Sequence, residues 1–269
     1  LTNDLVVQWA TLPGRRERRF PERLLEIVRP FARYRAAVDS STEVPPRGLL
    51  GRARRRPRHH IYSESEIADL VGQAQQVAVP AGLPSTTFAV LFGLLAACGL
   101  RVSEALRLTH DDVDLVAGVL TIRETKFRKS RLVPLHATTT QTLSTYNMCW
   151  GHTAPRPGSD AFFRTAAGTP LSYPTVRNVF LRLRKTLGWE ALVPRPRIHD
   201  LRHAFACRRL ERWYAEGADV APRVAALATY LGHTKVTDTY WYLTATPELL
   251  SLAATRFEAF AAGSKGASS

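Results

Sequence analysis

The residue types that handle phosphate chemistry gather near the C-terminal end of this chain. His199 and Arg202 are three residues apart at the start of an apolar-periodic run, so on a helix they would share one face. Gly232 is typical of a helix C-cap, His233 follows it, and Tyr242 comes nine residues later. Arg offers a planar fork of donors that fits phosphate oxygens, His adds a donor or a proton acceptor, and Tyr adds a nucleophilic oxygen. The set predicts a site for a phosphate group.

A metal site is the alternative that this spacing raises. His199 and His203 are four residues apart in HDLRH, which is the spacing of the zinc-binding HExxH motif. Asp200 stands in the place of the Glu, however, and Arg202 would bring a positive charge beside the ion. We therefore expect no metal and no cofactor, and we interpret His203 as a structural residue of the helix face.

The stretches HDLRH and LGH, followed by a Tyr nine residues after that last His, resemble the C-terminal signature of the tyrosine recombinases, the lambda-integrase-like family. The resemblance covers about residues 63–260 and implies two further parts upstream. GLRVSE contains Arg101 and Glu104, which match the family's first catalytic Arg and the acidic residue that supports it. TKFRKS lies between two strand-like runs and contains Lys126, at the place of the family's catalytic hairpin Lys.

The resemblance and the local chemistry together select six catalytic candidates, which are Arg101, Lys126, His199, Arg202, His233 and Tyr242. Breaking a DNA phosphodiester without a metal needs a nucleophile, a proton donor for the departing 5′ oxygen, and cations around the transition state. We expect Tyr242 to attack the phosphorus and form a 3′-phosphotyrosyl link. Lys126 would protonate the leaving 5′ hydroxyl. Because the covalent link conserves the energy of the bond, another strand can reverse the step without ATP.

The other four candidates would act on the phosphate oxygens and on the nucleophile. Arg101 and Arg202 are expected to clamp the non-bridging oxygens, and His233 is expected to donate one more hydrogen bond. His199 would accept the proton of the Tyr, because a phenol with a pKa of ~10 is barely ionised near neutrality. Glu104 and His203 are expected to support the site without taking part in the reaction.

Charge indicates a polyanionic partner. The chain of 269 residues has 37 basic and 23 acidic residues and a formal net charge of +14. Double-stranded DNA is the partner that this excess and the phosphate site favour. The candidate DNA contacts lie in the run RARRRPR and around the tip of the predicted hairpin: Arg52, Arg54, Arg55, Arg56, Arg58, Arg128, Lys129 and Arg131.

Periodicity predicts an α+β protein that is mostly helical, with a small antiparallel sheet. Helices are expected over residues 21–34, 63–78, 84–97, 137–149, 172–187, 220–230 and 247–260, and another from Ser103, as its N-cap, to Leu108. Strands are expected over residues 118–124, 131–135 and 161–164. The stripe Leu249, Leu250, Ala253, Phe257 and Phe260 on the last helix needs a partner surface.

Composition divides the chain into four segments. Residues 1–43 are interpreted as part of a helical core-binding domain, residues 44–62 as a basic linker, residues 63–262 as the catalytic domain and residues 263–269 as a flexible tail. The chain begins at Leu1 rather than Met, which favours an N-terminal truncation or an unusual start codon.

The family resemblance also implies partners. It predicts a homotetramer that joins two DNA sites through the C-terminal helix, and it admits an accessory directionality protein. Three widely spaced Cys without zinc spacing, and the absence of a long apolar run, favour a cytoplasmic, nucleoid-associated protein without a membrane segment. The expected activity is site-specific recombination for a mobile element. Its alternatives are strand relaxation of the type IB topoisomerase kind and a catalytically silent DNA-binding regulator.

Overall fold

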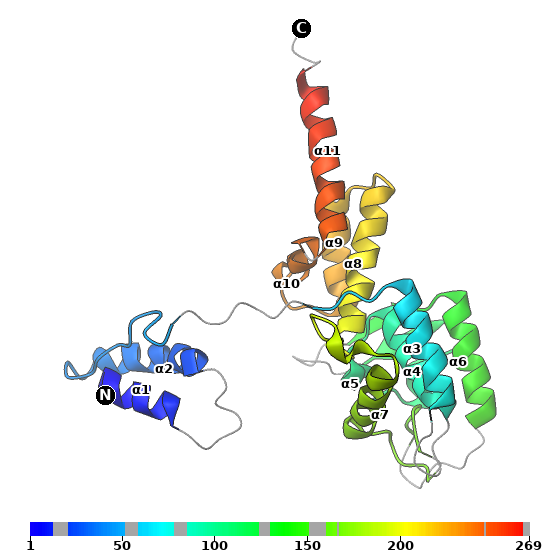
Figure 1. Ribbon diagram of the computed structural model, residues 1–269, viewed down its shortest axis with the longest axis horizontal. Coiled ribbons are helices and arrows are strands. Elements are labelled where there is room, and N and C mark those ends of the chain that lie inside the picture. The colour runs from blue at the N-terminus through cyan, green and yellow to red at the C-terminus, as the bar shows by residue number, and fades with distance from the viewer. Residues whose placement is uncertain are drawn as a thin grey trace. The chain divides into compact units, whose positions relative to one another are not determined.

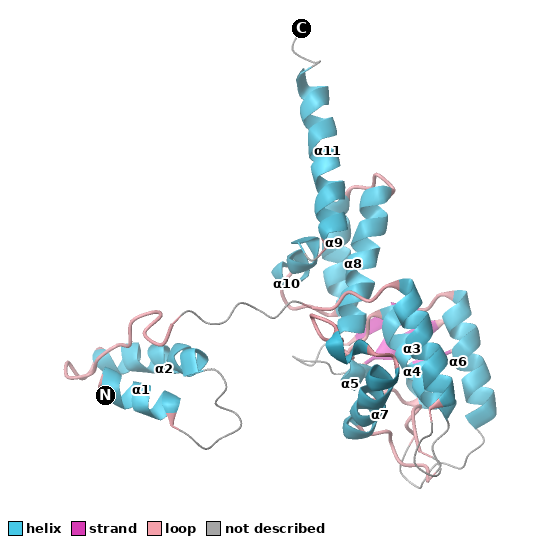
Figure 2. Cartoon of the chain, viewed as in Figure 1, coloured by secondary structure: helices cyan, strands magenta, loops and turns pink. Residues whose placement is uncertain are grey.

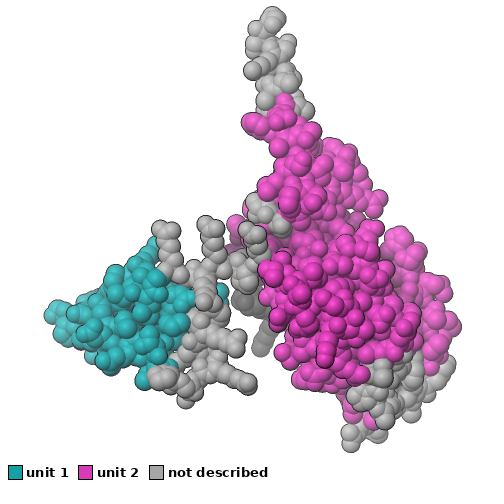
Figure 3. Space-filling view, viewed as in Figure 1, with its two compact units in different colours: residues 1–58 teal, residues 59–269 magenta. Residues whose placement is uncertain are grey.

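The structure, a computed structural model, describes residues 1–12, 21–51, 59–77, 85–123, 130–150, 160–165, 167–244 and 246–265. The chain forms two compact units, residues 1–58 and residues 59–269, which Figure 3 draws in teal and magenta. No helix among the described residues combines the length and the apolar character that a membrane span needs.

The first unit is built on two helices, α1 (Asn3–Thr11) and α2 (Pro21–Ala36). Their shared core contains Val6, Ala10 and Leu25, each at most 3% exposed. Thr2 caps α1, because its hydroxyl accepts a hydrogen bond from the backbone N–H of Leu5. The predicted helix over residues 21–34 is confirmed.

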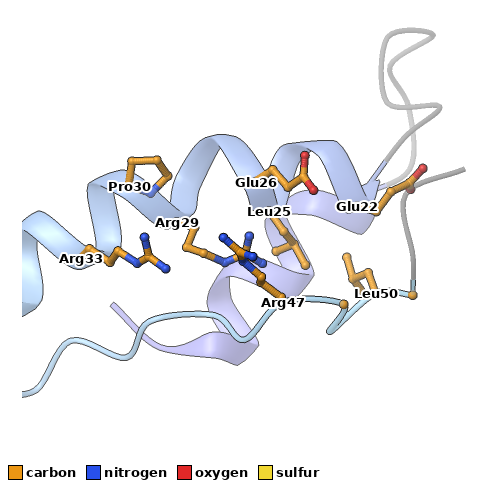
Figure 4. Close-up of a pocket in the computed structure, with 10 residues that line it drawn as sticks. Glu22, Leu25, Glu26, Arg29, Pro30, Arg33, Arg47 and Leu50 are labelled. Carbon is orange, nitrogen blue, oxygen red and sulfur yellow. The ribbon is translucent and has the colours of Figure 1, made fainter. Parts of the chain in front are cut away.

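Residues 45–51 lie against α2 in the same unit. The Arg29 side chain, which is buried, donates from Nε to the Pro45 carbonyl at 2.9 Å and from Nη2 to the Pro46 carbonyl at 3.0 Å. Between this segment and α2 is a pocket of ≈ 560 Å³ whose lining includes Arg33 and Arg47 (Figure 4). The stretch after α2 is therefore fixed to the helix by a guanidinium.

The second unit is mostly helical, and Figure 2 shows how little of it is strand. Its helices, labelled in Figure 1 where there is room, are α3 (Glu64–Gln76), α4 (Ser85–Cys98), α5 (Val102–Ala105), α6 (Ala137–Trp150), α7 (Tyr173–Thr186), α8 (Asp200–Ala215), α9 (Val220–Leu231), α10 (Thr237–Tyr240) and α11 (Pro247–Lys265). Single 3-10 turns are η1 (His110–Asp112), η2 (Trp189–Ala191) and η3 (Trp241–Thr244). The prediction of a mostly helical α+β fold is confirmed.

Helix α4 forms the centre of the main core. Phe88, Leu91 and Phe92 are fully buried, as expected for a helix that is apolar on all sides. Helix α3 covers it and begins with a capping box, in which the Ser63 hydroxyl accepts from the N–H of Glu66 and the Glu66 carboxylate accepts from the N–H of Ser63. The helix predicted over residues 63–78 is confirmed.

The sheet is antiparallel and, in the described residues, has the order β1 (Val113–Asp114), β2 (Val119–Ile122) and β3 (Arg131–Pro134). The register pairs Leu120 with Val133, and both side chains enter the main core. The two predicted strands around the hairpin are confirmed, while β1 was not predicted. Its two residues are too few to give an alternation pattern.

The strand predicted over residues 161–164 is wrong. These residues form only isolated bridges, one from Ala161 to Thr109 and one from Arg164 to Pro170. The apolar residues of the stretch were the basis of the prediction, but Phe162 and Phe163 are buried in the main core without pairing to a neighbouring strand. Burial in an irregular segment gives the same pattern as a short buried strand.

The helix predicted from Ser103 to Leu108 is also misplaced. Helix α5 begins at Val102, so Ser103 is its second residue and cannot be the cap. Arg101 occupies the N-cap position, and the Glu104 carboxylate accepts a hydrogen bond from its backbone N–H at 2.9 Å. The N-terminus of α5 is thus capped by the carboxylate of Glu104, a residue of the helix itself. This hydrogen bond fixes the backbone of Arg101 relative to Glu104.

A second cluster joins α8, α9, η3 and the start of α11. It includes Leu210, Leu227, Tyr242 and Leu249, and all four are buried. Gly232 ends α9 in the left-handed conformation, with φ of 67°. The predicted C-cap is therefore confirmed, and it turns the chain so that His233 leaves the end of the helix.

The apolar stripe predicted on the last helix is divided between two faces of α11. Leu249 is 1% exposed and packs into the second cluster, whereas Leu250 and Phe257 are 51% and 70% exposed. Arg256 holds the helix to its own unit by donating to the Gly217 and Ala218 carbonyls. One face of α11 thus docks in cis, and the other has two large apolar side chains in solvent.

Gly99 provides a test of the close approach between α4 and α8. Its φ is +61°, and a Cβ at this position would lie 2.4 Å from Cδ1 of Phe205. Gly188 also has a positive φ, +72°, but a Cβ there would meet no atom within 4 Å. We predict that Gly99→Ala lowers the free energy of unfolding by about 2–5 kcal/mol, because overpacking adds to the backbone strain.

The matched variant Gly188→Ala should lower the free energy of unfolding by only about 1–2 kcal/mol, since it has the strain without the clash. Urea unfolding followed by circular dichroism measures both values. Equal losses in the two variants would contradict the packing that places α8 on Gly99.

Candidate functional site

Arg202 lies at the centre of the site and is 2% exposed. Its Nη1 donates to the Gly99 carbonyl at 2.8 Å, and its Nη2 donates to the Leu231 carbonyl at 2.6 Å. These carbonyls belong to the ends of α4 and α9, so one guanidinium from α8 ties three helices together. Burial, and then the charge of Arg101, lower the pKa of Arg202 to about 10, and it stays protonated at neutral pH.

Glu104 joins two further guanidiniums. Its carboxylate, which is buried, accepts from Nη1 of Arg101 at 2.8 Å and from both Nη atoms of Arg131 at 2.8 and 3.2 Å. Arg131 also donates to the Tyr230 carbonyl at 2.7 Å, and Arg101 reaches the Gly232 carbonyl at 3.4 Å. Burial alone would raise the pKa of Glu104, but the hydrogen bonds from Arg131 and Arg101 lower it to about 2.

Tyr242 is buried beside these cations. It lies in η3 and is 3% exposed, while Tyr240, two residues earlier, is 51% exposed. Burial raises the pKa of the Tyr242 hydroxyl, while the charge of Arg202 opposes the shift. Only Tyr242 of these two residues packs into the site.

His233 follows the C-cap of α9 and stacks on Tyr242, with ring centroids 6.1 Å apart and planes at 20°. Its Nδ1 lies 2.7 Å from the hydroxyl of Thr239, which is fully buried. Burial and the charges of Arg202 and Arg101 lower the pKa of His233 to about 4. The imidazole is therefore neutral near pH 7.

His199 and His203 lie one turn apart at the start of α8, with ring centroids 4.9 Å apart. Desolvation and the charge of Arg202 lower the pKa of His199 to about 4, so it can accept a proton at neutral pH. His203 is buried, and its ring lies 5.4 Å from that of Tyr242. Burial and the neighbouring His59 lower the pKa of His203 to about 2.

Three side chains near the start of α8 form a group with metal-ligand character. Ligand atoms of His59, Asp200 and His203 lie within 4.8 Å of one another. Arg197, however, donates to both oxygens of the Asp200 carboxylate and lies 3.0 Å from Nδ1 of His59. A divalent ion would have to displace this guanidinium. The donor set therefore fits an ion pair network better than a metal centre.

The structure brings together five of the six catalytic candidates, namely Arg101, His199, Arg202, His233 and Tyr242. Lys126 lies outside the described residues, as do Arg128, Lys129 and the five Arg expected to contact DNA between positions 52 and 58. Arg131 is described, and its fork is occupied by Glu104 and the Tyr230 carbonyl.

Sequence reasoning missed three residues of the site. Thr239 is only six residues after His233 and contacts it, but a single Thr in a polar stretch does not indicate a functional role. His59 and Asp200 are 141 residues apart and approach to 2.9 Å. Asp200 was noted only as a departure from the HExxH pattern, and His59 only as part of a basic stretch.

Comparison with known proteins gives four consistent matches. Residues 63–248 match the phage integrase family. The y4rB protein of Sinorhizobium fredii, an integrase/recombinase by name, is 40% identical over 96% of this chain and 84% of its own length. The tyrosine recombinase XerC of Rhizobium meliloti is 33% identical over 57% of this chain and 44% of that protein. Among solved structures, the Tn1549 transposon integrase in complex with transposon right end DNA has a TM-score of 0.69 at 16% identity, covering 96% of this chain and 86% of that chain.

The Glu104 carboxylate provides a prediction for pH dependence. Its pKa is about 2 in the folded chain against an ordinary value of 4.5, so it stabilises the fold above pH 4.5 and loses this contribution as the pH falls toward 2. We predict that the free energy of unfolding of wild type is higher than that of Glu104→Gln, and that this difference falls by about 3 kcal/mol between pH 4.5 and pH 2. Denaturant titrations at several pH values measure the margin. A margin that does not change with pH would show that Arg131 and Arg101 do not stabilise the ionised form.

Proposed function

This chain belongs to the phage integrase family of tyrosine-type site-specific recombinases, and we propose that it cleaves and rejoins DNA strands through a 3′-phosphotyrosyl intermediate on Tyr242. The substrate is double-stranded DNA at a specific site, and the reaction serves the movement of a mobile element. The DNA complexes named for the Tn1549 transposon integrase support both points.

One observation carries the proposal. A buried Tyr lies beside the charge of a buried Arg, and the Tyr ring stacks on a His that is neutral. A cluster of cations with a nucleophilic oxygen beside it is the arrangement that attack on a phosphodiester needs. A Tyr that served only the core would not require these polar neighbours.

The protons move between residues of this chain and the DNA. Tyr242 loses its proton as its oxygen attacks the phosphorus, and His199 is our candidate acceptor because its pKa of about 4 leaves it neutral. The bond to the 5′ oxygen then breaks, and Lys126 supplies the proton that the leaving hydroxyl needs. Reversal by another 5′ hydroxyl returns both protons and joins a new strand.

The phosphate oxygens are held by Arg101, Arg202 and His233. Negative charge grows on the non-bridging oxygens in the transition state, so cations fixed around them lower the barrier. A neutral His233 whose Nδ1 accepts the Thr239 proton carries its own proton on Nε2, where it is a donor. Thr239 would thus set the tautomer that the site needs. The chemistry that we propose uses no metal ion and no ATP.

The contacts with DNA are distributed along the chain. We propose that residues 1–43 are part of a core-binding domain, that residues 44–62 are a basic linker, and that residues 63–262 are the catalytic domain. The two ends of this linker pack on the units that it joins, residues 45–51 on α2 and residues 59–62 on the second unit. Arg52, Arg54, Arg55, Arg56, Arg58, Arg128 and Lys129 are the proposed phosphate contacts. For Arg131, the ion pair with Glu104 favours support of the site over the DNA contact that the sequence indicated.

We propose that the exposed face of α11, which includes Leu250 and Phe257, mediates assembly on two DNA sites. Leu250 and Phe257 lie seven positions apart on this helix and are exposed, while the opposite face docks on its own unit. Two large apolar side chains on one helix face fit a neighbouring protomer. A contact of this kind that closes into a ring would give a tetramer and couple the sites.

The identity of the nucleophile gives the first prediction from this proposal. A nicked suicide substrate drawn from the chain's own target region should trap a covalent protein–DNA adduct with wild type. Tyr242→Phe should abolish the adduct and leave DNA affinity nearly unchanged, because it removes only the attacking oxygen. Tyr240→Phe is the matched control and should form the adduct normally. An adduct that persists in Tyr242→Phe and disappears in Tyr240→Phe would reverse the assignment.

The exposed face of α11 gives the second prediction. Phe257→Glu should leave single-site binding and adduct formation intact but reduce recombination between two sites about tenfold or more, because a charge cannot enter an apolar contact between protomers. Gel shifts and a two-site recombination assay measure the two properties. Glu258→Ala, a change at the next exposed position, is the control. Full recombination by Phe257→Glu would show that this face has no part in assembly.

A further inference from the structure

Residues 59–62 run along helix α8. The Tyr62 hydroxyl donates to the Arg197 carbonyl at 3.2 Å, and Nη2 of Arg208 donates to the Tyr62 carbonyl at 3.2 Å. Ile61 packs against both the main core and the second cluster. The segment is thus fixed to the helix that contains Arg202 and has His199 as its N-cap.

His59 makes the polar contact at the beginning of this segment. Its Nδ1 lies 2.9 Å from Oδ1 of Asp200, and its side chain is 17% exposed. Asp200 is fully buried at the first position of α8, directly after His199 and two positions before Arg202. The carboxylate also accepts from the backbone N–H and the guanidinium of Arg197. The position of His59 is therefore linked to the first turn of α8.

The ring of His59 is also part of an aromatic cluster that extends to Tyr242. It lies 3.7 Å from the ring of His203 and 4.8 Å from that of Trp241, edge to face. His203 in turn lies 5.5 Å from Trp241 and 5.4 Å from Tyr242. Neither ring nitrogen of His203 has a hydrogen-bond partner among the described residues, so packing by these neighbours holds the ring in place.

We propose that His59 is a positioning residue for strand cleavage, which holds α8 and η3 at the separation that brings Tyr242 to the phosphate. Its hydrogen bond to Asp200 and its ring contact with His203 fix the α8 side, and its ring contact with Trp241 fixes the η3 side. This inference rests on the proposed function of Tyr242. In this role His59 does not contact DNA. Loss of the His59 side chain should therefore slow strand cleavage and leave the affinity for DNA unchanged.

The expected effect follows from the geometry of attack. A nucleophile displaced by about 1 Å can lose on the order of 100-fold in rate. We expect His59→Ala to slow adduct formation about 10- to 100-fold at saturating DNA, because it removes the ring and the donor together. His59→Asn keeps an N–H donor near the position of Nδ1 but lacks the ring. It should react at a rate between those of wild type and His59→Ala.

The experiment compares wild type, His59→Ala, His59→Asn and His60→Ala in the full chain. His60 is the matched control, because its imidazole contacts Glu66 and the ring of Tyr62 and lies outside the cluster with Tyr242. Single-turnover adduct formation on the nicked suicide substrate gives the cleavage rate, and gel shifts give the affinity. Thermal melts by circular dichroism identify any variant that does not fold, in which case His59→Asn carries the test.

The outcomes separate the two proposals. Absence of an adduct with wild type would refute the proposed function, whatever His59 does. With an active wild type, three results would overturn the role of His59: an unchanged rate in His59→Ala, a loss confined to DNA affinity, or an equal slowing in His60→Ala. Slow cleavage in a folded His59→Ala with partial recovery in His59→Asn would support it.

Discussion

The burial of one guanidinium is the constraint on which the rest of this structure depends. Arg202 is 2% exposed, and a charged group can be kept in such a place only if its donors are paired. The chain supplies the carbonyls of Gly99 and Leu231, which are the free ends of two helices. Helices α4, α8 and α9 must therefore meet at Arg202. Because His233 follows the end of α9, the same constraint places it beside Tyr242.

Positive charge around this point is incompletely balanced within the described residues. Arg101, Arg131 and Arg202 lie together, and Glu104 is the carboxylate that pairs with the first two. Burial first, and then the charge of Arg202, lower the pKa values of the nearby His199 and His233. A phosphate group would supply the missing negative charge. The excess of positive charge is consistent with the substrate that we propose, and Tyr242 lies beside these cations.

Local signals were sufficient for much of the fold and of the site. The helical run that begins at Ser63 predicted the start of α3, and Gly232 predicted the end of α9, because caps depend on neighbouring residues alone. Tyr242 was selected by its spacing of nine residues from His233. Contacts between residues that are far apart in the sequence form the interior of the site, and local signals could not predict them. His59 meets Asp200 across 141 positions, and the packing of a whole domain decides that contact.

Chemical identification of the covalent intermediate tests the central claim most directly. The full chain would be incubated with a nicked suicide substrate in excess EDTA, digested, and examined by mass spectrometry. The account predicts an adduct that forms despite chelation, on the peptide containing Tyr242, with the DNA attached through its 3′ phosphate. An adduct through a 5′ phosphate, on another residue, or only after a divalent ion is restored would contradict it.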